Sequence, residues 1–116
     1  MQKYTGSCHC QAVTFEVDLE LETVMECNCS ICATKKFLLT FVPEENFKLL
    51  TGKDMLTEYR FNKNHVAHLF CKVCGVQSFG KGSKPDGTPV VAVNVRCLHD
   101  IDLDSLTITQ VDGKSF

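Results

Sequence analysis

Seven of the eight cysteines in this 116-residue chain fall into three tight groups. The amino-terminal segment MQKYTGSCHC has no apolar stretch typical of a signal peptide, so we expect a reducing, cytoplasmic location. Clustered cysteines in such a compartment bind metal more often than they form disulfides. The three groups read Cys8-His9-Cys10, Cys27-Asn28-Cys29-Ser30-Ile31-Cys32 and Cys71-Lys72-Val73-Cys74-Gly75.

The third group has the spacing of a zinc knuckle. Cys71 and Cys74 can both reach one ion at about 2.3 Å, and Gly75 supplies a backbone position free of the Cβ penalty. Such a knuckle usually gives half of a four-cysteine site. Cys8 and Cys10 can complete it, because residues two apart on an extended segment point the same way. We predict a structural zinc on these four residues, closing a loop of about sixty residues.

The middle group offers three thiolates, Cys27, Cys29 and Cys32, within six residues. Three protein ligands leave one position open, as in catalytic zinc sites, for water or an incoming thiol. Three thiolates on Zn²⁺ leave a net charge of −1, which favours thiol chemistry over water activation. Two alternatives stay open: a second closed site with Cys97 or His68 as fourth ligand, or unmetallated thiols.

Length and charge restrict the class of protein. A chain of 116 residues is expected to form a single domain, 1–116, and its modest core would benefit from a metal staple. The net charge of −2 offers no electrostatic footprint for nucleic acid or an anionic membrane. No apolar run reaches the roughly 18 residues of a membrane span. The oligomeric state is not indicated.

Alternating and short apolar segments predict a mainly β fold. Helical signals are few, with Ser30 a candidate N-cap for its helix, and the stretch 80–89, rich in Gly and Pro, predicts the longest loop. The expected strands cover 13–17, 37–42, 55–61, 66–70, 90–95 and 107–111. The expected helical turns cover 30–36 and 102–106, and the expected tight turns lie at 51–52, 86–87 and 112–113.

Four ordered motifs give a more specific indication. They are G-S-C-H-C-x-A-V-x-F-x-V at 6–17, C-N-C-S-x-C at 27–32, H-x-F-C-x-x-C-G at 68–75 and N-V-R-C-L at 94–98. Together they closely resemble the family of glutathione-dependent formaldehyde-activating enzyme and centromere protein V. The resemblance implies an Mss4-like fold of small twisted antiparallel sheets with one or two short helical turns.

The resemblance also implies a function. It implies a structural zinc on Cys8, Cys10, Cys71 and Cys74, in agreement with the pairing above. It implies a second, labile zinc on Cys27, Cys29 and Cys32, which would act catalytically through the metal. In the namesake enzyme that site is linked to glutathione and to formation of S-hydroxymethylglutathione from formaldehyde, a carbon–sulfur bond reaction.

Two positions depart from the family pattern. Gln11 stands where the first motif usually has Gly. After Cys32 the family commonly shows a Gly within a few residues, whereas this chain continues through Ala33 to Lys36 and Phe37 without one. The second departure bears on the shape of the pocket beside the second metal.

For several residues outside the three groups, the sequence is consistent with either a functional role or a structural role. Cys97 is either a reactive thiol beside Arg96 or a buried, inert one. Arg96 is either a receiver for a substrate carboxylate or a structural ion-pair partner. His68 is either an orienting group near Cys71 or a satisfied core histidine. Lys35 and its neighbour Lys36 either attract an anionic thiol or are simply solvated.

Three functions are therefore kept open. The first is a zinc-dependent carbon–sulfur lyase acting on a thiol–aldehyde adduct, with glutathione as the expected thiol. The second is a non-catalytic, zinc-stabilised module that binds a protein or a small ligand, since a fold alone does not fix function. The third is a redox enzyme similar to methionine sulfoxide reductases of the B type, with Cys97 as nucleophile.

Overall fold

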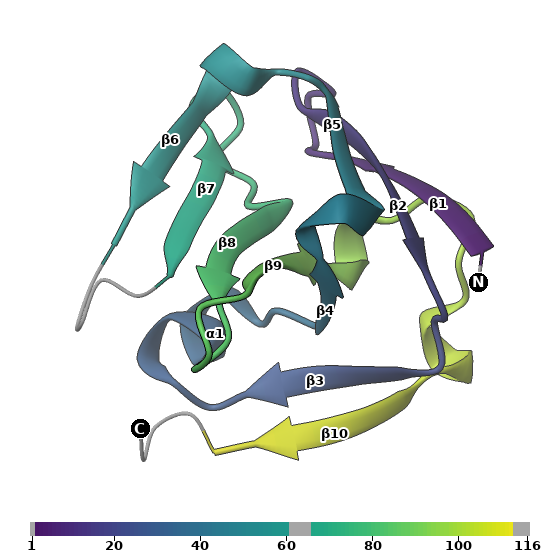
Figure 1. Ribbon diagram of the computed structural model, residues 1–116. Coiled ribbons are helices and arrows are strands. Elements are labelled where there is room, and N and C mark those ends of the chain that lie inside the picture. Colours follow the sequence, from purple (N-terminus) through teal and green to yellow (C-terminus); the bar gives the residue numbers. More distant parts are fainter. Residues whose placement is uncertain (1, 61–65, 113–116) are drawn as a thin grey trace.

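In the computed structural model, which describes residues 2–60 and 66–112, the chain forms two β-sheets (Figure 1). The strands are β1 (Gln2–Ser7), β2 (Thr14–Leu19), β3 (Thr23–Cys27), β4 (Leu39–Pro43), β5 (Phe47–Thr51), β6 (Leu56–Tyr59), β7 (Ala67–Cys71), β8 (Phe79–Ser83), β9 (Pro89–Asn94) and β10 (Thr107–Val111).

The smaller sheet has the strand order β1-β2-β5, and the larger has the order β10-β3-β4-β9-β8-β7-β6. Figure 1 shows the larger sheet curling from β6 at one edge to β10 at the other. The predicted mainly β class is confirmed. Adjacent strands are antiparallel except β10, which runs parallel to β3 because the chain returns to the start of β3, where the amide of Thr107 donates to the carbonyl of Glu22.

Helical structure is sparse, as expected. The α-helix α1 spans Ser30–Lys35, and the predicted turn at 102–106 is a short 3-10 helix. The N-cap is Cys29 rather than the predicted Ser30, because β3 and its turn carry the extended backbone through residue 29. Among the described residues, no helix is long and apolar enough to span a membrane. The 3-10 helices are Glu44–Asn46, Lys53–Met55, Val95–Cys97 and Leu103–Ser105.

The expected strands are found, with ends shifted by a few residues, and the turns at 51–52 and 86–87 are also present. The alternation along β2 is confirmed, since Phe15, Val17 and Leu19 are all buried. The strand β10 shows no alternation of burial along residues 107–110, which are all exposed and lie at an edge of the sheet. Phe61 and Gly113, at the ends of an expected strand and turn, lie outside the described residues.

The predicted loop 80–89 is wrong. Residues 79–83 form β8, and only the five residues between Ser83 and Pro89 connect it to β9. This strand is glycine-rich and has weak intrinsic propensity, but it is hydrogen-bonded to β7 on one side and β9 on the other. Pairing on both sides outweighs local propensity. The strands β1, β3 and β5 were not predicted, because their apolar residues show no clear period.

Three phenylalanine rings join the two sheets. Phe15 on β2 stacks on Phe47 of β5 at 5.2 Å between ring centroids, and Phe47 lies 4.6 Å from Phe79 of β8. Gly6 on β1 lies against this cluster, where a Cβ atom would come within 2.4 Å of the Phe15 ring. The packing holds the end of β1 close to the end of β7, and the first and third cysteine groups begin at these ends.

Candidate metal centres

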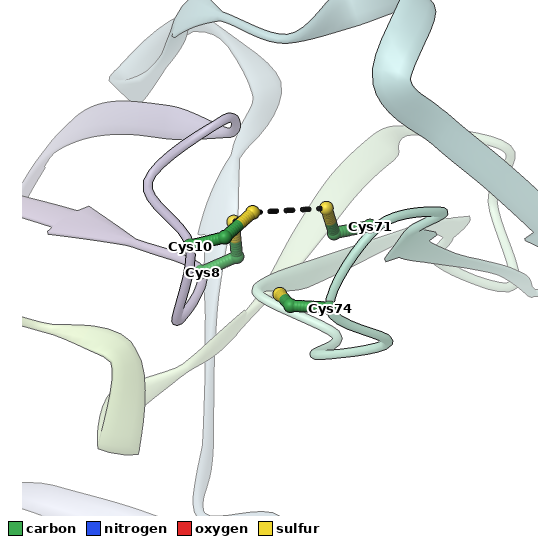
Figure 2. Close-up of side chains that lie close together, drawn as sticks. All are labelled: Cys8, Cys10, Cys71 and Cys74. Carbon is green, nitrogen blue, oxygen red and sulfur yellow. Dashed lines mark hydrogen bonds between the residues drawn. The ribbon is translucent and has the colours of Figure 1, made fainter.

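The sulfur atoms of Cys8, Cys10, Cys71 and Cys74 gather in one place, as predicted (Figure 2). All four lie within 4.8 Å of one another. The Cys8 and Cys10 sulfurs are 3.7 Å apart, and those of Cys10 and Cys71 are 3.6 Å apart. Thiolates at the corners of a tetrahedral zinc site, each about 2.3 Å from the metal, would stand about 3.8 Å apart. The four sulfurs therefore fit a zinc ion.

The first pair does not lie on an extended segment, which corrects the expectation. Cys8 and Cys10 occupy the turn between β1 and β2. The amide of Cys8 donates to the carbonyl of Val13, and the amide of Gln11 donates to the carbonyl of Cys8 at 3.2 Å. Gln11 closes the turn at φ 67°, the left-handed region that favours glycine. The turn bends so that both sulfurs point to the same side.

The second pair repeats this construction at the end of β7. The amide of Cys71 donates to the carbonyl of Val76, and the amide of Gly75 donates to the carbonyl of Cys71 at 2.8 Å. Gly75 has φ 81°, so the prediction of a special backbone position there is confirmed. A Cβ atom at Gly75 would meet nothing within 4 Å, so the requirement is one of backbone conformation and not of space.

The two turns also aim amides at sulfur. Val13 N–H donates to the Cys8 sulfur and Val73 N–H to the Cys71 sulfur, each at 3.4 Å. Such bonds favour the thiolate, the form that binds metal. Desolvation raises the pKa of Cys74, but backbone amides near residues 10 and 76 outweigh it and lower the pKa to about 6.

Without a cation the four thiols cannot all ionise. The amide of Ala12 lowers the pKa of Cys10, but desolvation and the neighbouring cysteines raise it to about 11. A divalent cation would lower these raised pKa values, because its positive charge favours every thiolate around it. The electrostatics of the cluster thus agree with its geometry.

The second candidate centre also forms as predicted. Cys27 ends β3, Cys29 is the N-cap of α1 and Cys32 lies inside the helix, with their three sulfurs within 4.8 Å of one another. The amide of Cys29 donates to the Cys27 sulfur at 3.4 Å. Cys32 is buried, whereas Cys27 and Cys29 are half-buried, so the cluster is reachable from solvent.

The thiols of this centre differ in acidity. Burial raises the pKa of Cys29, but the backbone amides of Cys32 and Ile31 at the start of the helix outweigh it and hold the pKa below its ordinary value. Burial, together with Cys29 and Cys27, raises the pKa of Cys32 well above the usual range. Here too a bound cation would be needed for all three sulfurs to be thiolates.

Neither residue considered as a fourth ligand joins this centre in the described part of the chain. Cys97 is buried, and its thiol lies 3.9 Å from the carbonyl of Gln77. His68 is also buried, and its Nδ1 lies 3.3 Å from the Gln77 side chain. The closed alternative, with Cys97 or His68 as fourth ligand, is therefore not found in the described part of the chain, and metal binding at an open three-cysteine site stays a prediction.

Two other candidates have structural roles. Arg96 donates from Nε to the carbonyl of Lys36 at 3.1 Å and so fastens the end of α1 to the segment after β9. Lys36 ends the helix in the left-handed conformation, at φ 57°. Cys97 is shielded, and burial raises its pKa, so it lacks the low pKa of a reactive cysteine. This removes the support for the redox interpretation.

Sequence reasoning missed Gln77, whose buried side chain bridges two candidate residues. Lys35 Nζ donates to Gln77 Oε1 at 3.3 Å, and Gln77 Nε2 donates to His68 Nδ1. Gln77 lies between the Cys71–Cys74 knuckle and β8, and no motif singles it out. Its role arises from sheet pairing between distant segments, which has no local signal.

The fold and the two thiol clusters define a small, mainly β protein with two candidate metal centres. The family model described as glutathione-dependent formaldehyde-activating enzyme matches residues 3–110, and the chain belongs to this family. The crystal structure of a Rhodobacter sphaeroides protein is similar, with a TM-score of 0.77 and 25% sequence identity, covering 90% of this chain and 99% of that chain. The resemblance seen in the sequence motifs is thereby confirmed.

Proposed function

We propose that the chain binds two zinc ions and acts as a carbon–sulfur lyase on a thiol–aldehyde adduct. The adduct class is that of S-hydroxymethylglutathione, with a small thiol such as glutathione and an aldehyde as its two parts. The four-cysteine centre would hold a structural ion, and the three-cysteine centre would hold the ion at which the thiol binds.

One observation carries the proposal. Cys27, Cys29 and Cys32 converge on one point with no fourth protein ligand among residues 2–60 and 66–112. A zinc ion held by three thiolates keeps a position for a thiol sulfur and lowers the pKa of that thiol. Two of the three cysteines are half-buried, so a small thiol can reach the centre. Family membership supports the same activity.

Addition of a thiol to an aldehyde, and its reversal, require no external oxidant or reductant. In the direction of adduct formation a thiolate attacks the carbonyl carbon of an aldehyde, a C–S bond forms, the electron pair of the C=O π bond moves to oxygen, and the oxygen takes up a proton. In the reverse direction the hydroxyl proton leaves, the carbonyl re-forms and the C–S bonding pair returns to sulfur. The chain's own part is to position Cys27, Cys29 and Cys32 as a fixed set of thiolates at the start of α1.

The test must separate catalysis from the uncatalysed reaction. Exchange NMR with ¹³C-formaldehyde and glutathione gives the rate of adduct formation and breakdown at equilibrium. We expect the wild-type protein to accelerate exchange above the protein-free rate, and Cys29→Ser to abolish the acceleration while remaining folded. Cys97→Ser is the matched control, because it removes a thiol outside both clusters, and it should keep the acceleration.

Wild-type protein that leaves the exchange rate at the protein-free value would contradict the lyase. In that case the interpretation as a non-catalytic zinc-stabilised binding module would stand. Equal acceleration by wild type and by folded Cys29→Ser would instead show that the three-cysteine centre is not the site of the reaction.

A further inference from the structure

Lys35 follows Cys32 by three residues on α1, and its ammonium group is held in place by neighbouring side chains. It donates to Gln77 Oε1 at 3.3 Å and lies over two aromatic rings, 5.3 Å from the centroid of Phe70 and 5.8 Å from that of Phe37. Contacts of this kind between a cation and a ring face are favourable and directional. The interpretation of Lys35 as a freely solvated side chain is therefore not supported.

Lys35 lies on the same short helix as one of the three cysteines. Lys35 follows Cys32 by three residues on α1, so the two lie on the same face of the helix, about 4.5 Å apart along its axis. Lys35 as a residue remains exposed to solvent, although its ammonium end is partly desolvated by the rings beneath it. A ligand at the three-cysteine centre that extends by about one helical turn would therefore come to the residue that carries the ammonium.

The neighbours of the ammonium are all uncharged. Gln77, Phe37 and Phe70 carry no charge, and no carboxylate pairs with Lys35 in the part of the chain that the structure describes. The side chains that contact the ammonium therefore supply no negative charge, and a carboxylate bound beside it would form a charge-assisted hydrogen bond.

The support beneath the ammonium is rigid and oriented. The Gln77 amide donates from Nε2 to His68 Nδ1, which requires that nitrogen to be unprotonated and leaves Oε1 to accept from Lys35. The Gln77 backbone carbonyl is fixed in turn by Asn94 Nδ2 at 2.9 Å. Gln77 and His68 are both buried, so the cation is held by a preorganised group and not by a mobile surface contact.

We infer that Lys35 is a specificity-determining residue that receives the carboxylate of the thiol substrate. This inference rests on the proposed function, and it narrows the thiol to one that carries a carboxylate. A carboxylate can accept a charge-assisted hydrogen bond from the exposed side of the ammonium while Gln77 keeps the other side. Neutral thiols and amino-thiols would lack this contact.

The experiment compares two thiols that differ at one group, which is a charged carboxylate in the acid and a neutral methyl ester in the other. Binding of 3-mercaptopropionate and of its methyl ester to the metal-loaded protein is measured by isothermal titration calorimetry. Wild type should bind the acid about fivefold to tenfold more tightly than the ester. Lys35→Met keeps the aliphatic stem on the rings and should reduce the ratio to about one, whereas Lys35→Arg should retain a preference for the acid.

Lys36→Met is the matched control, because it removes the same charge one residue along the chain and should leave the ratio unchanged. Metal content and thermal unfolding of each variant show that the centres remain intact. Equal binding of acid and ester by wild type, or a ratio that survives in Lys35→Met, would overturn the inference while leaving the proposed function standing.

Two further outcomes would also overturn the inference about Lys35. If Lys35→Met weakens acid and ester equally, the ammonium only offsets the charge of the metal–thiolate centre, and the inference is wrong. If neither thiol binds wild type while both metals are present, the proposed function fails, and the inference fails with it.

Discussion

The sulfur atoms of Cys10 and Cys71 lie 3.6 Å apart, although 61 positions separate the two residues in the chain (Figure 2). One belongs to the turn between β1 and β2, and the other ends β7 in the larger sheet. Their contact joins the two sheets next to the phenylalanine cluster. A metal ion at this point would fix the two sheets to each other more strongly than a core of this size can alone.

Loss of one thiolate from the four-cysteine centre should therefore unfold the protein. Structural zinc sites contribute about 10 kcal/mol or more at neutral pH, comparable to the whole stability of a small domain. We expect Cys71→Ser to lose the cooperative thermal transition and one metal ion per chain. Cys97→Ala, at a buried cysteine outside both clusters, should cost at most about 2 kcal/mol and keep the metal. Calorimetry and metal analysis check both, and an unchanged melting temperature in Cys71→Ser would contradict the structural role.

Replacement of Gln11 by glycine should stabilise the protein. Gln11 closes the first cysteine turn at φ 67°, and the left-handed conformation costs a residue with a Cβ roughly 1–2 kcal/mol. Part of the gain is offset by the greater freedom of glycine in the unfolded chain. The expected net effect of Gln11→Gly is about 0.5–1 kcal/mol of added stability, measured by chemical denaturation with metal present.

Gly75 provides the opposite control, because it occupies the same place in the second turn. Gly75→Ala should destabilise by about 1 kcal/mol, and it meets no steric clash, so its effect isolates backbone conformation. If Gln11→Gly and Gly75→Ala changed stability in the same direction, the left-handed backbone that the two turns share would not explain the stability changes.

His68 should make stability depend on pH below neutrality. Burial, and to a lesser degree the charge of Lys35, lower the pKa of His68 in the folded protein, whereas the unfolded chain has a pKa near about 6.5. Below that pH the unfolded state takes up a proton that the folded state does not. Stability is therefore complete above about pH 6.5 and falls as the pH drops, by up to about 1.4 kcal/mol per pH unit.

The variant His68→Gln removes this titration. Its unfolding free energy should fall less than that of the wild type between pH 7 and pH 5.5, when both carry metal. Parallel curves for wild type and His68→Gln would contradict the prediction.

The neighbouring members of each thiol cluster could be predicted from the sequence because ligand spacing is local information, and the joining of Cys8 and Cys10 with Cys71 and Cys74 could be predicted because a two-cysteine knuckle needs a second pair of ligands. Two cysteines on one turn, or three within six residues, are close in any fold that forms the turn. The special position at Gly75 could be predicted for the same reason. The left-handed backbone at Gln11 and at Lys36, one of the residues following Cys32, gives a reason why glycine is favoured at such positions.

Features that depend on distant pairing could not be predicted. β8 exists because β7 and β9 flank it, not because residues 79–83 favour a strand. The bridge from Lys35 through Gln77 to His68 joins three elements, and none of its members stands in a motif that signals the other two. Such contacts are fixed by sheet register, which a single sequence does not state.

We propose that the chain has one closed and one open zinc centre. The most direct test is the number of zinc ions per chain, by native mass spectrometry, before and after glutathione is added, for wild type and for Cys29→Ser. We predict two ions in wild type, with one lost or carrying glutathione after addition, and one ion in Cys29→Ser that is indifferent to glutathione. Two ions in wild type that both ignore glutathione, or no zinc in gently prepared native protein, would contradict the account.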